Sequence, residues 1–283
     1  MKPPPFEYVR PASVEETLEL LETPGAKVLA GGQSLVPLLN LRLARPTLLV
    51  DVGALPSLDR IEPDADGALR LGALVRHHQL LADPMVARRA PLLRQAVGEV
   101  GHVAIRNRGT LGGSLAHADP SAELATATVA LDAELRLVSR QGERRVRARD
   151  FFRGPFMTDL RDEELLVEVR VPARPAGEGS AFVEVAPRQG DFAIVAVAVL
   201  AQVRAGRVGG ATIAWSGAAS TPVLAEELAA SLEGMTLEGD GLERACGAAA
   251  LRLSPPSDAR TSAEYRRAAL GVLAARAVRA AAV

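Results

Sequence analysis

The chain of 283 residues contains only one cysteine, Cys246. It can form no intrachain disulfide, and a single thiolate cannot hold an iron–sulfur cluster or a cysteine-rich zinc site. Aromatic residues make up only 3% of the chain, which argues against a surface that stacks nucleic-acid bases. The formal net charge of -1 gives no sign of the basic face that a phosphate backbone requires. We therefore expect no metal site and no nucleic-acid partner.

Long apolar runs are also missing. No stretch reaches the roughly 18 apolar residues of a membrane-spanning helix, so we expect no membrane span. The first residues, Met1-Lys2-Pro3-Pro4-Pro5, lack the apolar core of a secretory signal, and the expected location is the cytoplasm. The four histidines do not have the spacing of metal ligands, since the adjacent His77 and His78 would point roughly 100° apart on a helix.

Two short segments with paired glycines stand out, Ala30-Gly31-Gly32-Gln33-Ser34 and Thr110-Leu111-Gly112-Gly113-Ser114. Adjacent glycines let the backbone approach a ligand closely and adopt positive φ. Each segment precedes a predicted helix, whose first N–H groups are unpaired and attract anions. One such segment indicates a phosphate. Two of them indicate a diphosphate held from both sides, as in a dinucleotide.

Neither of the common nucleotide motifs is present. The sequence has no G-x-x-x-x-G-K-S/T and no G-x-G-x-x-G after a strand, which disfavours a P-loop and a Rossmann site. For each glycine pair alone, a tight turn with positive φ is the simpler interpretation. The pairing favours a shared ligand, because both segments also carry hydroxyl groups, Ser34 in the first and Thr110 and Ser114 in the second.

Capping and turn signals predict the surrounding elements. A strand at 28–30 and a helix from Ser34 to Leu41 flank the first glycine pair, and a capping box at 13–16 starts an earlier helix. Asp119-Pro120 is predicted to start a helix that runs through Leu131. Residues 193–203 and 207–215 are typical of a hairpin, and three helices follow, the first from Thr221-Pro222. The segment 172–179, rich in proline and glycine, is the best linker candidate.

Longer strings contain both glycine pairs, AGGQSLVPLLNLRLARPTLLVDV at 30–52 and IRNRGTLGGSLAHADPSAELATATVALDAEL at 105–135. Shorter stretches follow in order at 150–152, 164–166, 188–193 and 262–267. Together they resemble the FAD-binding motifs and other landmarks of the flavoprotein subunits of molybdenum hydroxylases. Within that family the sequence is most similar to the medium subunits of aerobic carbon monoxide dehydrogenases and their relatives.

The resemblance implies an α+β fold with two domains. Residues 1–173 would form an FAD-binding domain of the para-cresol-methylhydroxylase and vanillyl-alcohol-oxidase type. That domain would consist of two α/β subdomains, at about 1–54 and 55–173. Residues 178–283 would form a C-terminal flavoprotein domain with a small antiparallel sheet and helices. A boundary near Pro172 agrees with the predicted linker.

The resemblance also implies which residues bind FAD. Gly31 to Ser34 would meet the pyrophosphate through backbone N–H groups and the Ser34 hydroxyl, and the second motif would close on it from the other side. Glu123 would bind the adenosine ribose, although relatives often have the shorter Asp there, and Leu166 would pack near the flavin ring. The full set of cofactor-binding residues is Leu29, Ala30, Gly31, Gly32, Gln33, Ser34, Leu35, Thr110, Leu111, Gly112, Gly113, Ser114, His117, Asp119, Glu123 and Leu166.

One departure from the family pattern concerns the flavin ring. Some relatives carry a lysine near the flavin in the segment that matches 182–184, and this sequence has none. Arg188 and Asp191 are the nearest charged candidates for tuning the ring, and an ordinary loop ion pair explains them equally well.

By resemblance, the chain is an oxidoreductase subunit that carries FAD but oxidises no substrate itself, so no catalytic side chain is expected. It would take electrons from the [2Fe–2S] clusters of a small partner subunit and pass them to an external acceptor. A large molybdopterin subunit would oxidise the substrate, and the expected assembly is a dimer of heterotrimers.

Three alternatives stay open on the sequence. The chain could be the FAD subunit of a xanthine, aldehyde or N-heterocycle dehydrogenase of the same family. It could instead be a stand-alone flavin oxidoreductase, although no acid, base or nucleophile stands out for one. A scaffold that has lost the flavin is the third, and the intact glycines and hydroxyls of both motifs argue against it.

Overall fold

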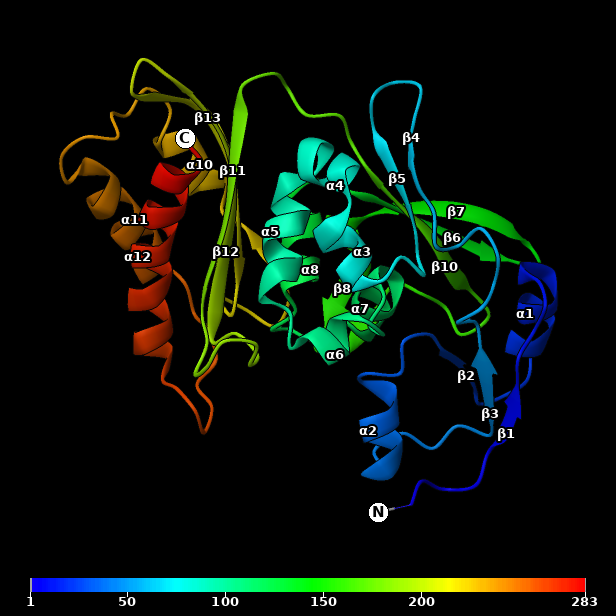
Figure 1. The fold of residues 1–283 in the computed structure, drawn as a ribbon. Helices are drawn as coiled ribbons and strands as arrows, with labels where there is room; N and C mark the ends of the chain where they lie inside the picture. Colours follow the sequence, from blue (N-terminus) through cyan, green and yellow to red (C-terminus); the bar gives the residue numbers. More distant parts are fainter. Residues whose placement is uncertain (1, 283) are drawn as a thin grey trace.

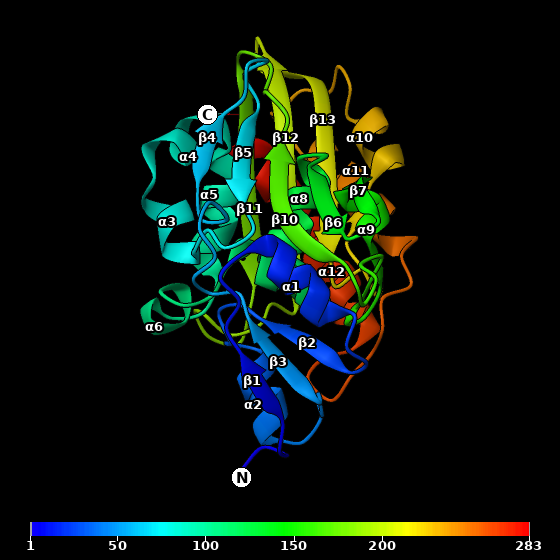
Figure 2. The same cartoon turned by 90° about the vertical axis from the view of Figure 1, so that its right-hand side faces the viewer.

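The computed structural model describes residues 2–282, and its elements stack in alternating layers of helices and sheets (Figure 1). The C-terminal helices cover one face of a four-stranded sheet, and helices from the middle of the chain pack on its other face. The middle helices lie in turn against a five-stranded sheet. A small parallel sheet from the N-terminal residues adjoins the far side of the five-stranded sheet (Figure 2).

The N-terminal unit is a β–α–β–α–β segment with a parallel sheet in the order β1-β3-β2. Its elements are β1 (Glu7–Val9), α1 (Val14–Leu21), β2 (Ala26–Leu29), α2 (Leu35–Asn40) and β3 (Leu48–Asp51). The predicted cap of α1 is confirmed, since Ser13 Oγ accepts a hydrogen bond from Glu16 N at 3.1 Å. Apolar side chains of this unit pack against Leu165 and Val167 of the five-stranded sheet.

The middle part of the chain supplies an antiparallel sheet in the order β4-β5-β10-β6-β7 and most of the helices. Every residue of α8 is buried between this sheet and the C-terminal one. Apart from Glu123 at its start, the helix has small or apolar side chains on all sides, which this burial requires. The elements are β4 (Ile61–Pro63), β5 (Leu69–Gly72), α3 (His77–Ala82), α4 (Pro84–Arg89), α5 (Pro91–Glu99), α6 (Val103–Arg106), α7 (Leu111–His117), α8 (Glu123–Ala130), β6 (Glu134–Ser139), β7 (Gly142–Arg147), α9 (Ala148–Phe151), β8 (Phe152–Gly154), β9 (Met157–Thr158) and β10 (Leu165–Val171).

The C-terminal part forms an antiparallel sheet in the order β11-β12-β13-β14, with α10 to α12 on one face. The predicted small antiparallel sheet with helices is therefore confirmed. So is the hairpin, in which β12 and β13 turn at Ala205-Gly206 with φ of 49° and 71°. The elements are β11 (Glu178–Val185), β12 (Val195–Arg204), β13 (Arg207–Ser216), β14 (Val223–Leu224), α10 (Glu226–Ser231), α11 (Gly241–Leu251) and α12 (Ala263–Ala280).

Two predicted helix starts are wrong. Asp119 does not begin a helix, because its Oδ1 accepts a hydrogen bond from Ser121 N at 2.8 Å in a tight turn, and α8 begins only at Glu123. The helix expected from Thr221-Pro222 begins at Glu226, because Val223–Leu224 pair with β13 as an edge strand. None of the helices in residues 2–282 combines the length and apolar character that crossing a membrane requires.

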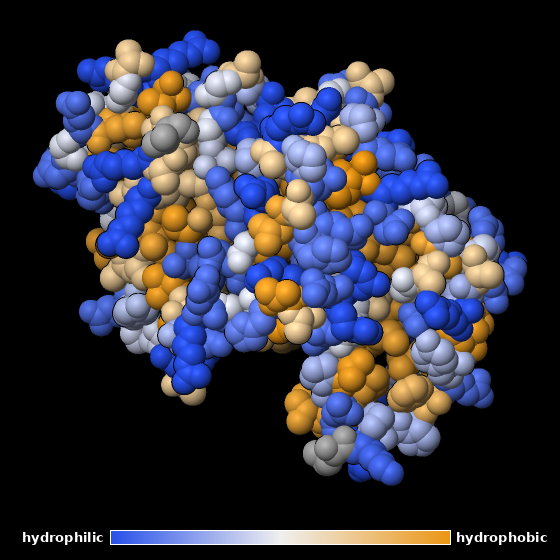
Figure 3. Space-filling view, viewed as in Figure 1, coloured by the Kyte–Doolittle hydropathy of each residue, from blue (hydrophilic) through white to orange (hydrophobic). Residues whose placement is uncertain are grey.

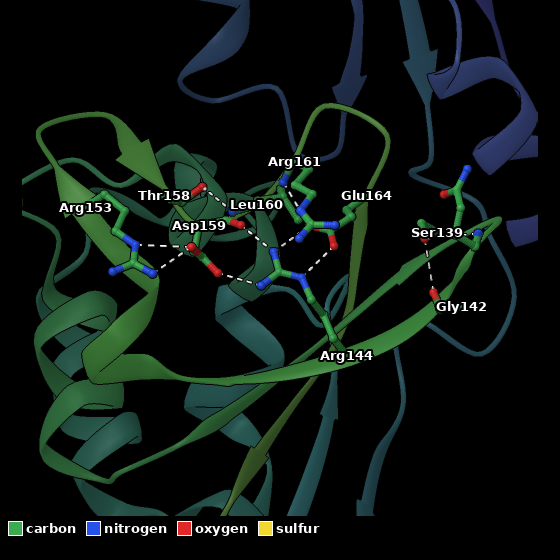
Figure 4. A network of polar contacts seen from close by, with 10 residues as sticks. Ser139, Gly142, Arg144, Arg153, Thr158, Asp159, Leu160, Arg161 and Glu164 are labelled. Atoms are coloured by element: carbon green, nitrogen blue, oxygen red, sulfur yellow. Dashed lines mark hydrogen bonds and ion pairs between the residues drawn. The ribbon is translucent and has the colours of Figure 1, made fainter.

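A cluster of ion pairs holds the segment 159–164 against β7 (Figure 4). Arg144 of β7 donates from Nε to Glu164 Oε1 at 2.6 Å and from Nη1 to Asp159 Oδ2 at 2.5 Å. Only 4% of the Glu164 side chain is exposed. Although burial raises the pKa of Glu164, hydrogen bonds from Arg144 and from Arg161 N hold it below its ordinary value. The cluster thus fixes the chain just before β10 enters the sheet.

We predict that Arg144→Met lowers the free energy of unfolding by about 2–3 kcal/mol at pH 7, because it leaves the buried Glu164 without its cation. Since the pKa values of Glu164 and Asp159 are lowered in the folded protein, the stabilisation is complete at neutral pH. It is lost as the pH falls through those lowered values and both carboxylates gain protons. Urea unfolding at several pH values measures the effect.

The matched control is Arg153→Met. The Arg153 side chain also pairs with Asp159 but is 56% exposed, so its loss is expected to cost less than about 1 kcal/mol. Equal effects of the two substitutions would contradict the role assigned to Arg144.

Candidate functional site

The first glycine motif touches the second motif and the backbone of Arg108 and Gly109 directly before it. A Cβ atom added at Gly31 would lie 2.2 Å from Arg108 O and 2.9 Å from Gly109 Cα. A Cβ at Gly113 would lie 3.6 Å from the Ala30 Cβ. Only glycine at position 31 permits this approach, so the two segments form one continuous surface although they are distant in sequence.

The first motif offers unused hydrogen-bond donors. Gly31, Gly32, Gln33 and Ser34 connect β2 to α2, and Gly32 has φ of +71°. Their four backbone N–H groups donate to no acceptor within residues 2–282. The Ser34 hydroxyl makes none of the capping bonds expected of it. Consecutive free N–H groups of this kind are what binds phosphate oxygens in proteins.

The second motif differs from the first in that it forms the first turn of a helix, α7, and not a loop before one. Leu111 N donates to Val75 O at 2.9 Å and Gly112 N to Ala73 O at 2.8 Å. Gly113 N donates to Thr110 Oγ1 at 3.1 Å. The expectation that both motifs present unpaired N–H groups is therefore wrong for this one. Its glycines serve close packing instead, since a Cβ at Gly112 would lie 2.6 Å from the Ala73 Cβ.

A hollow of about 640 Å³ lies along the first motif. Besides Leu29 to Gln33, three arginines line it, Arg10, Arg76 and Arg108. Arg76 Nη1 also donates to Arg108 O at 2.9 Å, which ties it to the second motif. Sequence reasoning named none of the three arginines as site residues, because none lies within a glycine motif and only the fold brings Arg10 and Arg76 there. A second hollow of about 530 Å³ lies near Pro24 and Arg45, away from both motifs.

His77 supports the second motif and was also missed. Its side chain is buried, and Nε2 lies 3.0 Å from Thr110 O. Burial lowers the pKa of His77 to about 4 against the opposing effect of that carbonyl, so the ring is neutral at pH 7. Because a carbonyl only accepts, the proton sits on Nε2 and is donated to it. The sequence signals this residue only through the adjacent pair His77-His78, whose spacing does not suit a metal site.

The remaining predicted site residues lie after the second motif or in β10. The half-buried His117 ring packs 5.1 Å from the ring of Phe156, and burial lowers its pKa. Asp119 turns the chain, as described above. Leu166 is buried in the core beneath α7 and α8, and Glu123 is only 7% exposed at the start of α8. Arg188 and Asp191 form no ion pair in residues 2–282.

Comparisons with known proteins identify the family. Residues 4–174 match the model of the FAD binding domain in molybdopterin dehydrogenase, and residues 180–281 match that of the CO dehydrogenase flavoprotein C-terminal domain. The chain belongs to the family of FAD-binding medium subunits of molybdenum hydroxylases. It is an oxidoreductase subunit, and its cofactor is FAD.

Individual relatives and solved structures are similar to this chain over nearly its whole length. Subunit alpha of the 6-hydroxypseudooxynicotine dehydrogenase complex of Paenarthrobacter nicotinovorans is 42% identical over 269 residues, which cover 94% of this chain and 90% of that one. The carbon monoxide dehydrogenase medium chain of Hydrogenophaga pseudoflava is 36% identical over 283 residues, 99% of this chain and 98% of that one. A chain of the quinoline 2-oxidoreductase structure from Pseudomonas putida 86 superimposes with a TM-score of 0.95 at 38% identity, covering 100% of this chain and 98% of that one.

We predict that Gly31→Ala weakens FAD binding at least tenfold, because its methyl group would force the two motifs apart. The matched control is Gly98→Ala in α5, where the nearest atom to the new methyl is Leu81 Cδ1 at 3.9 Å. That change is expected to stabilise the helix by up to about 1 kcal/mol and to leave binding unaltered. Fluorescence titration of the full chain with FAD compares the two, and unaltered affinity in Gly31→Ala would contradict the role of the close contact.

Proposed function

We propose that the first glycine motif, with Arg76 and Arg108, binds the pyrophosphate of FAD. The observation that carries the proposal is the row of four free N–H groups at Gly31 to Ser34. Gly31, Gly32 and Gln33 line one hollow together with Arg76, Arg108, Arg10 and a single carboxylate, Asp51. Two phosphate charges require donors and positive charge together, and the residues present supply both. The cofactor therefore fits the site.

The other predicted residues take supporting roles in this proposal. Thr110 to Ser114 form the wall that faces the first motif, with Thr110 held by His77. Ala30 begins the first motif, Leu29 and Leu35 flank it, and His117 and Asp119 follow the second. Glu123 accepts hydrogen bonds from the adenosine ribose, and Leu166 supports the flavin ring from β10. These assignments rest on the motif positions and on the contact between the motifs.

The chemistry that FAD supplies when bound is electron transfer between one-electron and two-electron partners. The side chains of this chain position the cofactor and shield it, and no general acid or base is required of them. We assign the binding machinery to residues 1–173, with subdomains at about 1–54 and 55–173, and the covering C-terminal domain to residues 178–283.

We further propose the partners that the family implies. A small subunit with [2Fe–2S] clusters would deliver electrons to this chain, a large molybdopterin subunit would oxidise the substrate, and an external acceptor would take the electrons away. The relatives support this, since they are named as medium chains or as subunits of complexes. The segment after α2 exposes two apolar side chains, Leu41 at 58% and Leu43 at 74%, which offer surface for such contacts. Figure 3 shows hydrophobic residues at the surface in the part of the molecule where α2 lies.

The substrate of the whole enzyme belongs to the partner. The relatives are named for carbon monoxide, nicotine derivatives and caffeine, so one subunit architecture serves several substrates. A carbon monoxide dehydrogenase-like enzyme and a xanthine, aldehyde or N-heterocycle dehydrogenase are both compatible with this chain. The cytoplasmic location stays a prediction.

The first test is retention of flavin. We expect the full chain, mixed with FAD and desalted, to keep the visible spectrum of oxidised flavin. The Gly32→Asp/Gly113→Asp double variant should lose it, because it adds two carboxylates and strains the φ of +71° at Gly32. The control Gly241→Asp adds a carboxylate in open space at the start of α11 and should retain the flavin. No flavin in the wild type, alone or co-expressed with its partner subunits, would overturn the proposal.

A second prediction concerns the arginines. Arg76→Gln and Arg108→Gln should each lower FAD affinity about tenfold at low salt, the effect of losing one charge-assisted hydrogen bond. The difference from wild type should shrink at high salt, because these side chains are not fully buried and salt screens them. Arg88→Gln, exposed on α4, is the matched control. Equal affinities for all four proteins at low salt would exclude the arginines from the site.

A further inference from the structure

The carboxyl ends of the three parallel strands in the N-terminal sheet meet at one edge, and residues at this edge line the hollow along the first motif. Arg10 follows β1, the first motif follows β2, and Asp51 is the last residue of β3. Asp51 and Leu29, the last residue of β2, are register partners in the sheet. The strand order therefore places a carboxylate beside the free N–H groups of the first motif.

The Asp51 carboxylate is held in place through both of its oxygens. The Tyr8 hydroxyl of β1 donates to Oδ2, and Gly53 N donates to Oδ1 at 2.9 Å. The hydrogen bond to Asp51 raises the pKa of the Tyr8 hydroxyl, so Tyr8 remains the donor at neutral pH. A rotation of the Asp51 side chain away from the hollow would break both bonds. Its negative charge is therefore fixed at this position.

No cation pairs directly with this carboxylate. None of the ion pairs in residues 2–282 involves Asp51, and none involves the three arginines of the hollow, Arg10, Arg76 and Arg108. Asp51 is also the only carboxylate among the described residues that line the hollow. A fixed negative charge repels every anion that enters, and it repels an anion of higher charge more strongly. Its presence in a site for phosphate therefore points to selection among anions.

The charges of the hollow suit a pyrophosphate that is esterified at both ends. Three guanidinium groups less one carboxylate leave two positive charges. In a dinucleotide such as FAD each phosphate keeps a single negative charge, because its other positions are ester or anhydride bonds. A nucleotide that ends in a free phosphate carries more, since a terminal phosphate reaches a charge of about -1.5 to -2 at neutral pH. The additional charge would lose water without gaining a cation, which costs free energy.

We propose that Asp51 is a specificity-determining residue of the cofactor site, and that it favours a dinucleotide over nucleotides that end in a free phosphate. This inference rests on the proposed function of the hollow. ADP and ATP contain the adenosine diphosphate part of FAD, so the free N–H groups and the arginines attract them as well. Repulsion from Asp51 grows with the charge of the ligand and separates the two classes.

A purely structural role for Asp51 leads to a different expectation. A side chain that only closes the turn at Gly53 and receives the Tyr8 hydroxyl supports folding, so its loss weakens the binding of all ligands alike. The substitution Asp51→Asn separates the two roles. Its amide oxygen accepts from Gly53 N and its NH2 group donates to the Tyr8 oxygen, so both contacts persist while the charge is lost.

The experiment is a competition titration of the full chain at pH 8 and low salt. ADP-ribose, ADP and ATP displace FAD, and flavin fluorescence reports the displacement. ADP-ribose has the same doubly esterified pyrophosphate as FAD but no flavin, so we expect the wild type to bind it more tightly than ADP. In Asp51→Asn the affinity for ADP should rise about tenfold relative to ADP-ribose, and the affinity for ATP should rise further.

A compensating substitution tests whether the charge itself is responsible. Arg10→Gln/Asp51→Asn again leaves two positive charges in the hollow, so its ratio of affinities should return toward that of the wild type. The matched control is Asp59→Asn, exposed after β3 and outside the hollow, and it should leave the ratio unaltered. A double variant that keeps the ratio of Asp51→Asn would contradict the role of charge.

Two further measurements separate selectivity from folding. The melting temperature of flavin-free Asp51→Asn should match that of the wild type, because both hydrogen bonds of the side chain persist. In the wild type alone, the preference for ADP-ribose over ADP should shrink at high salt, which screens the repulsion.

Equal changes in the affinities for ADP-ribose and ADP in Asp51→Asn would overturn the inference and leave the proposed function standing. A wild type that binds ADP as tightly as ADP-ribose, or whose preference does not respond to salt, would do the same. No binding of FAD by the wild type would overturn the proposed function itself.

Discussion

The contact between Gly31 and the Arg108-Gly109 backbone is the constraint on which the site depends. At this point the small parallel sheet meets the helical layer, and a methyl group at position 31 would lie 2.2 Å from a carbonyl oxygen. The helical layer braces the same spot, with Arg76 donating to Arg108 O and His77 to Thr110 O. The glycine is thus required for its small size, and the positive φ belongs to its neighbour Gly32.

The two glycine motifs differ in how their backbone N–H groups are used. The first keeps its N–H groups free because it follows a strand end and no other segment accepts from it within residues 2–282. The second donates its N–H groups to Ala73, Val75 and Thr110, which makes it rigid and fixes the wall opposite. An anion site needs both properties, since free donors bind the ligand only when a fixed backbone holds them in place.

The layered arrangement also buries acidic side chains between helices and sheets. Helix α8 is buried on all sides between two sheets, and its first residue, Glu123, is buried with it. The face of β11 that meets α5 and α8 carries Phe182 within the core and Glu184 near the helix ends. Apolar packing thus holds Glu123 of α8 and Glu184 of β11 in buried surroundings, and burial raises the pKa of each.

The sequence by itself determined the features that depend on neighbouring residues. The cap at Ser13, the turn at Ala205-Gly206 and both glycine motifs arise from residues a few positions apart, and the motif order was enough to indicate the family. Local signals also misled. Asp119 before a proline is typical of a helix start, yet its carboxylate closes a turn, and Ser34 leaves its helix uncapped.

Only the tertiary structure decided which groups meet. The arginines of the hollow, the support of Thr110 by His77 and the gathering of Glu99, Glu123 and Glu184 join elements from distant parts of the chain. The use of the N–H groups in the second motif was equally hidden, because their acceptors, Ala73 and Val75, lie in another segment. Hydrogen bonds and burial act through space, so a single sequence records the side chains but not the partners that set their protonation and role.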